Sequence, residues 1–86
     1  MFYVYILRSE SHPDQTYVGF TADLKQRLRT HNQSGSPHTA KYAPWHIEFY
    51  CAFKHENRAL EFERYLKSHS GKAFANKRLL QTAQQT

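Results

Sequence analysis

Hydrophobic positions along the chain predict three strands. Residues 2–7 are continuously apolar and rich in β-branched and aromatic types, which at this length indicates a strand buried on both faces. Residues 16–20 are again strand-like, and a polar turn separates the two segments, so we expect an antiparallel hairpin with a long loop. Residues 45–53 alternate and predict a third strand. One face of that strand would carry Trp45, Ile47, Phe49, Cys51 and Phe53.

Two longer segments carry apolar residues at the three- and four-residue spacing of amphipathic helices. The first is predicted to have Thr21 as its N-cap and to run to about Asn32, before a stretch rich in Ser, Gly and Pro at 34–37. The second covers residues 56–68, and Ser70-Gly71 would end it.

The remaining segments are shorter or irregular. Residues 37–44 predict a surface loop with at most a short helical turn around 39–42. Residues 72–80 predict a last short helix that packs Phe74 and Leu79, and the polar residues 81–86 predict a frayed tail.

Together these elements predict one small α+β domain over residues 1–80, with a three-stranded antiparallel sheet flanked by helices. Cys51 is the only cysteine, so no intrachain disulfide can form and a reducing compartment is favoured. The N-terminal apolar run meets Arg8 too early for a membrane span, and we expect a soluble, cytoplasmic protein.

The charge balance adds a candidate partner. Twelve Lys and Arg residues against seven Asp and Glu leave a net charge of +5, which favours a polyanion such as nucleic acid. A basic protein with a well-solvated surface explains the same balance equally well.

Three polar residues fall on the buried sides of the two longer helices. Arg27 and His31 lie four positions apart beside the apolar stripe of the first helix, and Glu63 falls among the apolar residues of the second. A carboxylate near the core is costly unless it is paired or binds a cation. Two explanations stay open: an ion pair of Glu63 with Lys67 or Arg27, or a Mg²⁺ site on Glu63 beside a phosphate-binding Arg27.

The tyrosines and these helix residues follow one another in a specific order. Tyr3-Val4-Tyr5 is followed after eleven residues by Tyr17-Val18-Gly19, and then come Arg27, His31 and Glu63. Taken singly, the tyrosines would be ordinary core rings with a hydroxyl that reaches water. As a series, the residues resemble the GIY-YIG nuclease family over residues 2 to about 80. The chain departs from the name-giving pattern where Tyr3 replaces Gly and where Val4 and Val18 each replace Ile.

The resemblance implies a metal-dependent endonuclease that hydrolyses phosphodiester bonds of DNA. Tyr17 matches the position of the family's general base, and Arg27 matches the group that binds the scissile phosphate. Glu63 would be the single protein ligand to Mg²⁺ or Mn²⁺, and Tyr5 and His31 match supporting positions of the catalytic site. We therefore expect all five residues to converge on one face of the sheet.

The form of the chain is most similar to the small single-domain bacterial members, which are related to the nuclease domain of structure-specific junction endonucleases. A chain this small has no extra module for reading sequence, so we expect it to select DNA by shape, as branched or single-stranded DNA, in repair or recombination. The alternative is a non-catalytic or partner-dependent nucleic-acid-binding module. RNA is a weaker candidate partner, since a phosphate site does not by itself distinguish the sugar.

Overall fold

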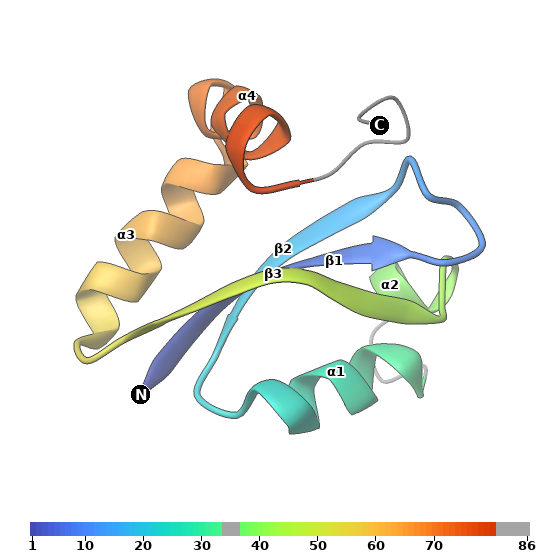
Figure 1. Ribbon diagram of the computed structural model, residues 1–86. Coiled ribbons are helices and arrows are strands. Elements are labelled where there is room, and N and C mark those ends of the chain that lie inside the picture. The colour runs from blue at the N-terminus through green and yellow to red at the C-terminus, as the bar shows by residue number, and fades with distance from the viewer. Residues whose placement is uncertain (34–36, 81–86) are drawn as a thin grey trace.

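The computed structural model describes residues 1–33 and 37–80. Among these residues, three antiparallel strands form one sheet in the order β2-β1-β3, with helices on both faces (Figure 1). The predicted α+β fold is confirmed, whereas the predicted tail at 81–86 and most of the Ser- and Gly-rich helix stop lie outside the described residues. The elements are β1 (Phe2–Ser9), β2 (Thr16–Thr21), α1 (Leu24–Asn32), α2 (Pro37–Ala40), β3 (Trp45–Phe53), α3 (Glu56–Lys67) and α4 (His69–Arg78).

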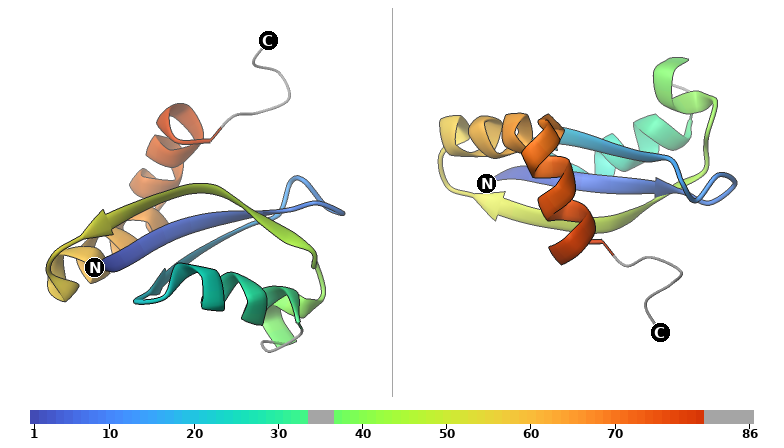
Figure 2. Two further views of the ribbon diagram at one scale, coloured as in Figure 1. Left: turned by 60° about the horizontal axis from the view of Figure 1, so that its bottom comes forward. Right: turned by 90° about the horizontal axis from the view of Figure 1, so that it is seen from above.

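Strand β1 is the centre of the molecule. It pairs with β2 on one side and with β3 on the other, α1 covers one face of the sheet, and α3 and α4 cover the other (Figure 2). Its residues Val4, Tyr5, Ile6 and Leu7 are at most 1% exposed, which confirms the prediction of a strand buried on both faces. A continuous apolar run is the pattern that such a doubly covered strand requires.

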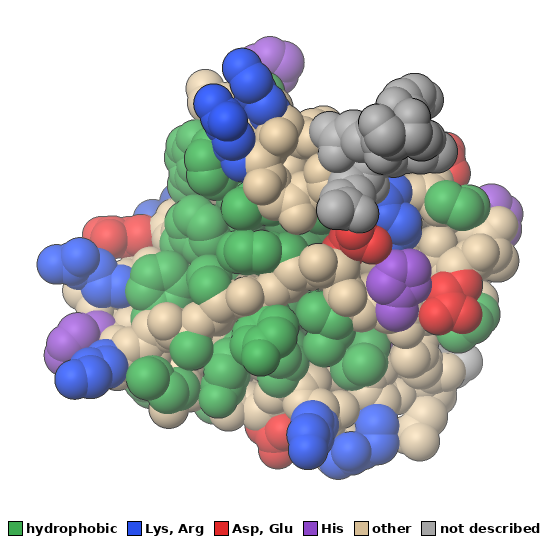
Figure 3. Space-filling model, viewed as in Figure 1, with side chains coloured by type: hydrophobic (Ala, Val, Ile, Leu, Met, Phe, Trp, Pro, Cys, Tyr) green, Lys and Arg blue, Asp and Glu red, His purple; other side chains and the backbone are tan. Residues whose placement is uncertain are grey.

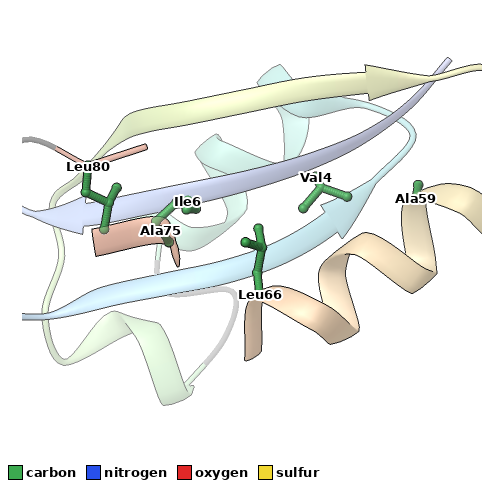
Figure 4. Packing of buried hydrophobic residues seen from close by; sticks show 6 residues of the cluster. All are labelled: Val4, Ile6, Ala59, Leu66, Ala75 and Leu80. Atoms are coloured by element: carbon green, nitrogen blue, oxygen red, sulfur yellow. The ribbon is translucent and has the colours of Figure 1, made fainter. Parts of the chain in front are cut away.

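The two faces of β1 belong to separate hydrophobic clusters. Val4 and Ile6 pack under α3 and α4 against the buried residues Ala59, Leu66, Ala75 and Leu80 (Figure 4). On the other face, Tyr5 and Leu7 pack with Trp45 and with the apolar stripe of α1, formed by Leu24 and Leu28.

Strand β3 changes face at a bulge, so the prediction that its five apolar residues share one face is wrong. Ile6 pairs with Phe49 and Leu7 pairs with Ile47, which leaves Glu48 as an extra residue in β3. Because side chains alternate along a strand, one extra residue sends everything beyond it to the opposite face. Trp45 and Ile47 therefore join the cluster under α1, and Phe49, Cys51 and Phe53 join the one under α3.

The start of α1 also differs from the prediction. Asp23, not Thr21, is the N-cap: its side chain accepts a hydrogen bond from the Gln26 N–H at 3.1 Å. The Thr21 hydroxyl bonds the backbone of Asp23 instead, at 3.0 and 3.2 Å, and shapes the turn out of β2. Both residue types cap helices well, so local preference alone does not choose between them. Further on, the predicted irregular segment contains α2, which begins two residues before the expected turn.

The corner between α3 and α4 is tighter than predicted. Ser68 ends α3 and caps α4, because its side chain accepts from the Gly71 N–H at 3.1 Å. Gly71 is therefore buried in the first turn of α4 and does not end α3, as had been predicted. A Cβ at this position would lie 1.7 Å from the carbonyl oxygen of Tyr65, so only glycine allows α4 to approach α3 this closely.

The prediction that Phe74 packs in the core is wrong, because Gly71 and Ala75 are the buried residues of α4, whereas Leu79 does pack against the core as predicted. Phe74 is 38% exposed and lies against Tyr65, with ring centroids 6.0 Å apart. Apolar side chains lie exposed over α3 and along β3 on this side of the molecule (Figure 3). Within the described ranges, no helix combines the length and the hydrophobicity that crossing a bilayer requires.

Gly71→Ala should destabilise the fold, although alanine is normally the better helix residue by about 1 kcal/mol. The added methyl group meets backbone and not a flexible side chain, so α4 must move away from α3 at a cost of about 1–3 kcal/mol. Denaturant unfolding of wild type and variant measures this. Ser70→Ala, at the exposed neighbouring position, is the control and should change the free energy of unfolding by about 0.5 kcal/mol or less. A Gly71→Ala protein as stable as wild type would contradict the close approach.

Candidate active site

The hydroxyl of Tyr5 is the meeting point of the candidate site. Its side chain projects from β1 toward α1, and the residue is 1% exposed. The hydroxyl oxygen lies 2.9 Å from Nε2 of His31 and accepts a hydrogen bond from Nε of Arg27 at 3.4 Å. Two side chains one turn apart on α1 are thereby tied to the central strand.

Gly19 makes this position of the Tyr5 ring possible. It pairs with Tyr5 across β1 and β2, and a Cβ at Gly19 would lie 2.3 Å from the Tyr5 hydroxyl oxygen. The ring therefore lies across β2 in space that any larger residue would occupy. The sequence showed Gly19 within the Tyr17-Val18-Gly19 motif, but its role becomes visible only with the strand register.

His31 is completely buried and has partners for both ring nitrogens. Its Nδ1 lies 2.8 Å from Oγ1 of Thr39 in α2, a residue that sequence analysis did not single out. Burial lowers the pKa of His31, and the positive charge of Arg27 lowers it further, so the ring is neutral near pH 7. Two tautomers fit these contacts: Nε2 accepts from the Tyr5 hydroxyl while Nδ1 donates to Thr39, or Nε2 donates to Tyr5 while Nδ1 accepts from Thr39.

Further contacts hold α1 and α2 in place around this ring. The Asn32 side chain bonds both backbone groups of Trp45, at 2.6 Å to the N–H and 3.1 Å to the carbonyl oxygen. The indole N–H of Trp45 in turn donates to the carbonyl oxygen of Thr39 at 2.8 Å. These bonds fix the end of α1 to the start of β3, so the orientation of His31 does not depend on α1 alone.

Arg27 and Tyr5 hold each other in defined protonation states. The hydrogen bond to Tyr5 raises the pKa of Arg27, against an opposing effect of burial, so the guanidinium stays charged. Burial raises the pKa of Tyr5, and the charge of Arg27 offsets part of that rise. Tyr5 therefore stays a neutral phenol, suited to orienting Arg27 and not to removing a proton.

Tyr17 is the more accessible of the two tyrosines. Its ring centroid lies 4.9 Å from that of His31 and 6.5 Å from that of Tyr5. The residue is only partly buried, and it lies between two hollows. One, of about 590 Å³, lies between the β1–β2 hairpin and α3 and α4; the other, of about 260 Å³, is lined by residues that include Thr39 and Trp45.

The structure thus brings Tyr5, Tyr17, Arg27 and His31 together on the α1 face of the sheet. Glu63 comes from α3, on the opposite face, so the five residues do not share one face as expected. The two sides meet at the edge strand β2. Tyr17 lines the larger of the two hollows, hereafter the groove, and so does Lys67, the ion-pair partner of Glu63. The charge of Glu63 also contributes to the raised pKa of Tyr5, after burial and Tyr17.

Glu63 itself pairs with Lys67, at 3.0 Å between Oε2 and Nζ. Its side chain is 20% exposed, so the carboxylate is reachable from solvent. Among the described residues, no three or more His, Cys, Asp or Glu side chains gather as a metal-binding group. A single carboxylate that already holds one cation suits a hydrated hard ion such as Mg²⁺, which keeps most of its ligands as water or phosphate oxygen.

The fold and these residues define the class of protein. The chain belongs to the GIY-YIG family, since residues 1–78 match the model of the GIY-YIG catalytic domain.

Individual relatives fall into two groups. The chain is 41% identical over 63 residues to structure-specific endonuclease subunit SLX1 of Malassezia globosa, an alignment that covers 69% of this chain and 14% of the relative. For the SLX1 homolog of Giardia intestinalis the identity is 34% over 65 residues, which cover 71% and 18%. The chain thus spans less than a fifth of either protein. A UPF0213 protein of Pediococcus acidilactici, encoded in the ldhD 5' region, is 36% identical over 75 residues, covering 83% of this chain and 74% of the relative.

Gly19→Ala should displace the Tyr5 ring and break its hydrogen bond to His31. The clash involves the hydroxyl and two ring carbons, so we expect a loss of about 1–3 kcal/mol in the free energy of unfolding. Nitrogen NMR of the imidazole should show a shifted Nε2 signal, because Nε2 loses its hydrogen-bond partner Tyr5. In a Tyr5→Leu background, which removes the colliding atoms, the cost of Gly19→Ala should nearly vanish. An equal cost in both backgrounds would refute this explanation.

Stability should fall as the pH drops below about 6.5, the ordinary histidine value. The pKa of His31 is lowered in the folded protein, so the unfolded chain takes up the proton first, and stability is lost as the pH falls toward the folded pKa. Thermal melts between pH 7.5 and 5 measure the slope. His31→Gln should flatten it, whereas His69→Gln, at an exposed position, should not. Equal slopes for the two variants would show that His31 is not the titrating group.

Proposed function

We propose that this protein is a metal-dependent endonuclease that hydrolyses phosphodiester bonds of DNA and selects its substrate by shape. The observation that carries the proposal is the partly buried, permanently charged guanidinium of Arg27, held by Tyr5 beside the accessible Tyr17. A cation fixed next to a possible proton acceptor at the edge of an open groove suits a phosphate under attack by water.

Arg27 would bind a non-bridging oxygen of the scissile phosphate and stabilise the charge that grows on it in the transition state. Its Nε is engaged by Tyr5, and its side chain also hydrogen-bonds Tyr17, so a phosphate would accept from the other N–H groups of the guanidinium, which has five in all. Tyr5 would orient this side chain through its hydroxyl, which His31 holds in place.

Tyr17 would take the proton from the attacking water. A phenol ordinarily titrates near 10, so it serves as a base only where cationic charge stabilises the phenolate. Arg27 supplies part of that charge. The partial exposure of Tyr17, against the 1% exposure of Tyr5, makes it the tyrosine that water can reach.

Glu63 would hold Mg²⁺ or Mn²⁺ through its carboxylate. When bound, such an ion supplies positive charge for the phosphate and for the leaving oxygen. Its waters and the phosphate would complete the ligand shell, because in the described part of the chain no group of three or more His, Cys, Asp or Glu side chains gathers to hold a metal ion.

The net charge of +5 supports a nucleic-acid substrate, and the names of the SLX1 relatives, structure-specific endonuclease subunits, make branched or single-stranded DNA the first candidate. We place the activity in DNA repair or recombination on the same ground. The second candidate is a nucleic-acid-binding module that cuts only with a partner protein. A panel of flap, junction, single-stranded and RNA substrates with Mg²⁺ or Mn²⁺ separates the two, because the module alone would bind these substrates and cut none.

Glu63→Gln should abolish cleavage and metal binding together while the fold survives. The Glu63–Lys67 pair is partly exposed, so its loss should change the free energy of unfolding by only about 0.3–0.5 kcal/mol. Arg27→Ala and Tyr17→Phe should each lower the cleavage rate by about 100-fold or more. Glu61→Gln, two residues away and exposed, is the matched control and should cleave like wild type. Undiminished cleavage by Glu63→Gln would overturn the role given to Glu63.

A further inference from the structure

The ion pair between Glu63 and Lys67 lies beside the groove described above. The two residues are four positions apart on α3, and their charged atoms are 3.0 Å apart. The Lys67 side chain is 53% exposed, more than twice the 20% of Glu63, so the lysine is the more solvent-accessible member of the pair. Such a pair adds little to the stability of the fold and opens easily.

We propose that in the free protein Lys67 occupies the position beside Glu63 that the divalent ion takes when it binds. Once the ion is bound, Lys67 turns into the groove and binds a backbone phosphate. The proposal rests on the function proposed above and adds a positioning role for Lys67. It explains how Glu63 stays paired with a cation both before and after the ion arrives.

Electrostatics gives the direction of the exchange. A divalent ion interacts with a carboxylate more strongly than an ammonium does, and the two cations repel each other at contact distance. Binding of the ion therefore expels Lys67 from the carboxylate. The flexible stem of a lysine lets its charge move several ångströms while its backbone stays in α3.

The groove offers a destination for that charge. It has a volume of about 590 Å³, and Lys67 already lines it, together with Tyr17 from the candidate site. Arg8 and Lys72 add positive charge to its walls, Asn76 adds an amide, and Asp14 is the one acid among its lining residues. Arg8 also pairs with Glu48 at 3.4 Å, so a phosphate of the DNA strand that continues from the scissile bond would meet mainly the ammonium groups of Lys67 and Lys72 there.

This arrangement couples the two ligands of the site. Without the ion, the Lys67 ammonium is paired with Glu63. With the ion bound, the ammonium can pair with a phosphate of the nucleic acid. The ion should therefore tighten nucleic-acid binding through Lys67, and nucleic acid should tighten ion binding by the same factor.

The first test measures the ion without nucleic acid. Mn²⁺ is titrated into wild type, Lys67→Met, Lys72→Met and Glu63→Gln, and free Mn²⁺ is followed by electron paramagnetic resonance. Lys72→Met removes the same charge from the same groove but does not contact Glu63, so it measures the general effect of charge. We expect Lys67→Met to bind Mn²⁺ at least about twofold more tightly than Lys72→Met, and Lys67→Arg, which keeps the competing cation, to bind like wild type.

Equal Mn²⁺ affinities for Lys67→Met and Lys72→Met would overturn the proposal even if the enzyme cleaves DNA. If Glu63→Gln still binds Mn²⁺ with wild-type affinity, the metal role of Glu63 fails, and with it both proposals.

The second test measures the affinity of the protein for a branched DNA duplex with and without Mn²⁺. All variants carry Tyr17→Phe as well, which slows cleavage. Lys72→Met should weaken binding by the same factor in both conditions. Lys67→Met should weaken it mainly when Mn²⁺ is present. A loss that is the same with and without the ion would refute the movement of Lys67 into the groove.

Discussion

The candidate site depends on one buried hydroxyl, that of Tyr5. A polar group this deep must be hydrogen-bonded or it destabilises the fold, and among the described residues no buried side-chain polar atom lacks a partner. Tyr5 meets this requirement through His31 and Arg27. The same bonds that satisfy the core thereby set the distance of α1 from the sheet and the direction of the guanidinium. Stability and site geometry have one physical cause here.

The sequence predicted the elements that depend on local pattern, and it failed where long-range pairing decides. The apolar run of β1 is visible at once, because a doubly covered strand needs nothing else. The bulge at Glu48 is not visible, because it follows from how β3 meets β1 and from the contacts of the Glu48 carboxylate with Arg8 at 3.4 Å and His46 at 3.0 Å. Burial raises the pKa of Glu48, but the hydrogen bond from His46 and the charge of Arg8 outweigh it, so the pKa is lowered.

The site shows the same division. Helical spacing alone placed Arg27 and His31 beside the core, and they are there. Thr39 and Gly19 could not be predicted as parts of the site, because their roles come from contacts between segments that lie apart in the sequence. Thr39 meets His31 across a gap of eight residues, and Gly19 matters only because the Tyr5 ring lies over it. Spacing also placed Glu63 on the buried side of its helix, but it could not show which face of the sheet that helix covers.

That last point changes how the site is built. With α1 on one face and α3 on the other, residues from the two helices can meet only where the sheet ends. Strand β2 is such an edge, and Gly19 lets the Tyr5 hydroxyl approach it from one side while α3 passes on the other. A site at an edge gives a large phosphate backbone access that a site in the middle of the covered face would not. It also places Arg27 and Glu63 on helices that pack against separate hydrophobic clusters on opposite faces of the sheet. The separation accounts for the partner that each residue has: Arg27 bonds Tyr5 on its own face of the sheet, and Glu63 pairs with Lys67 on its own helix.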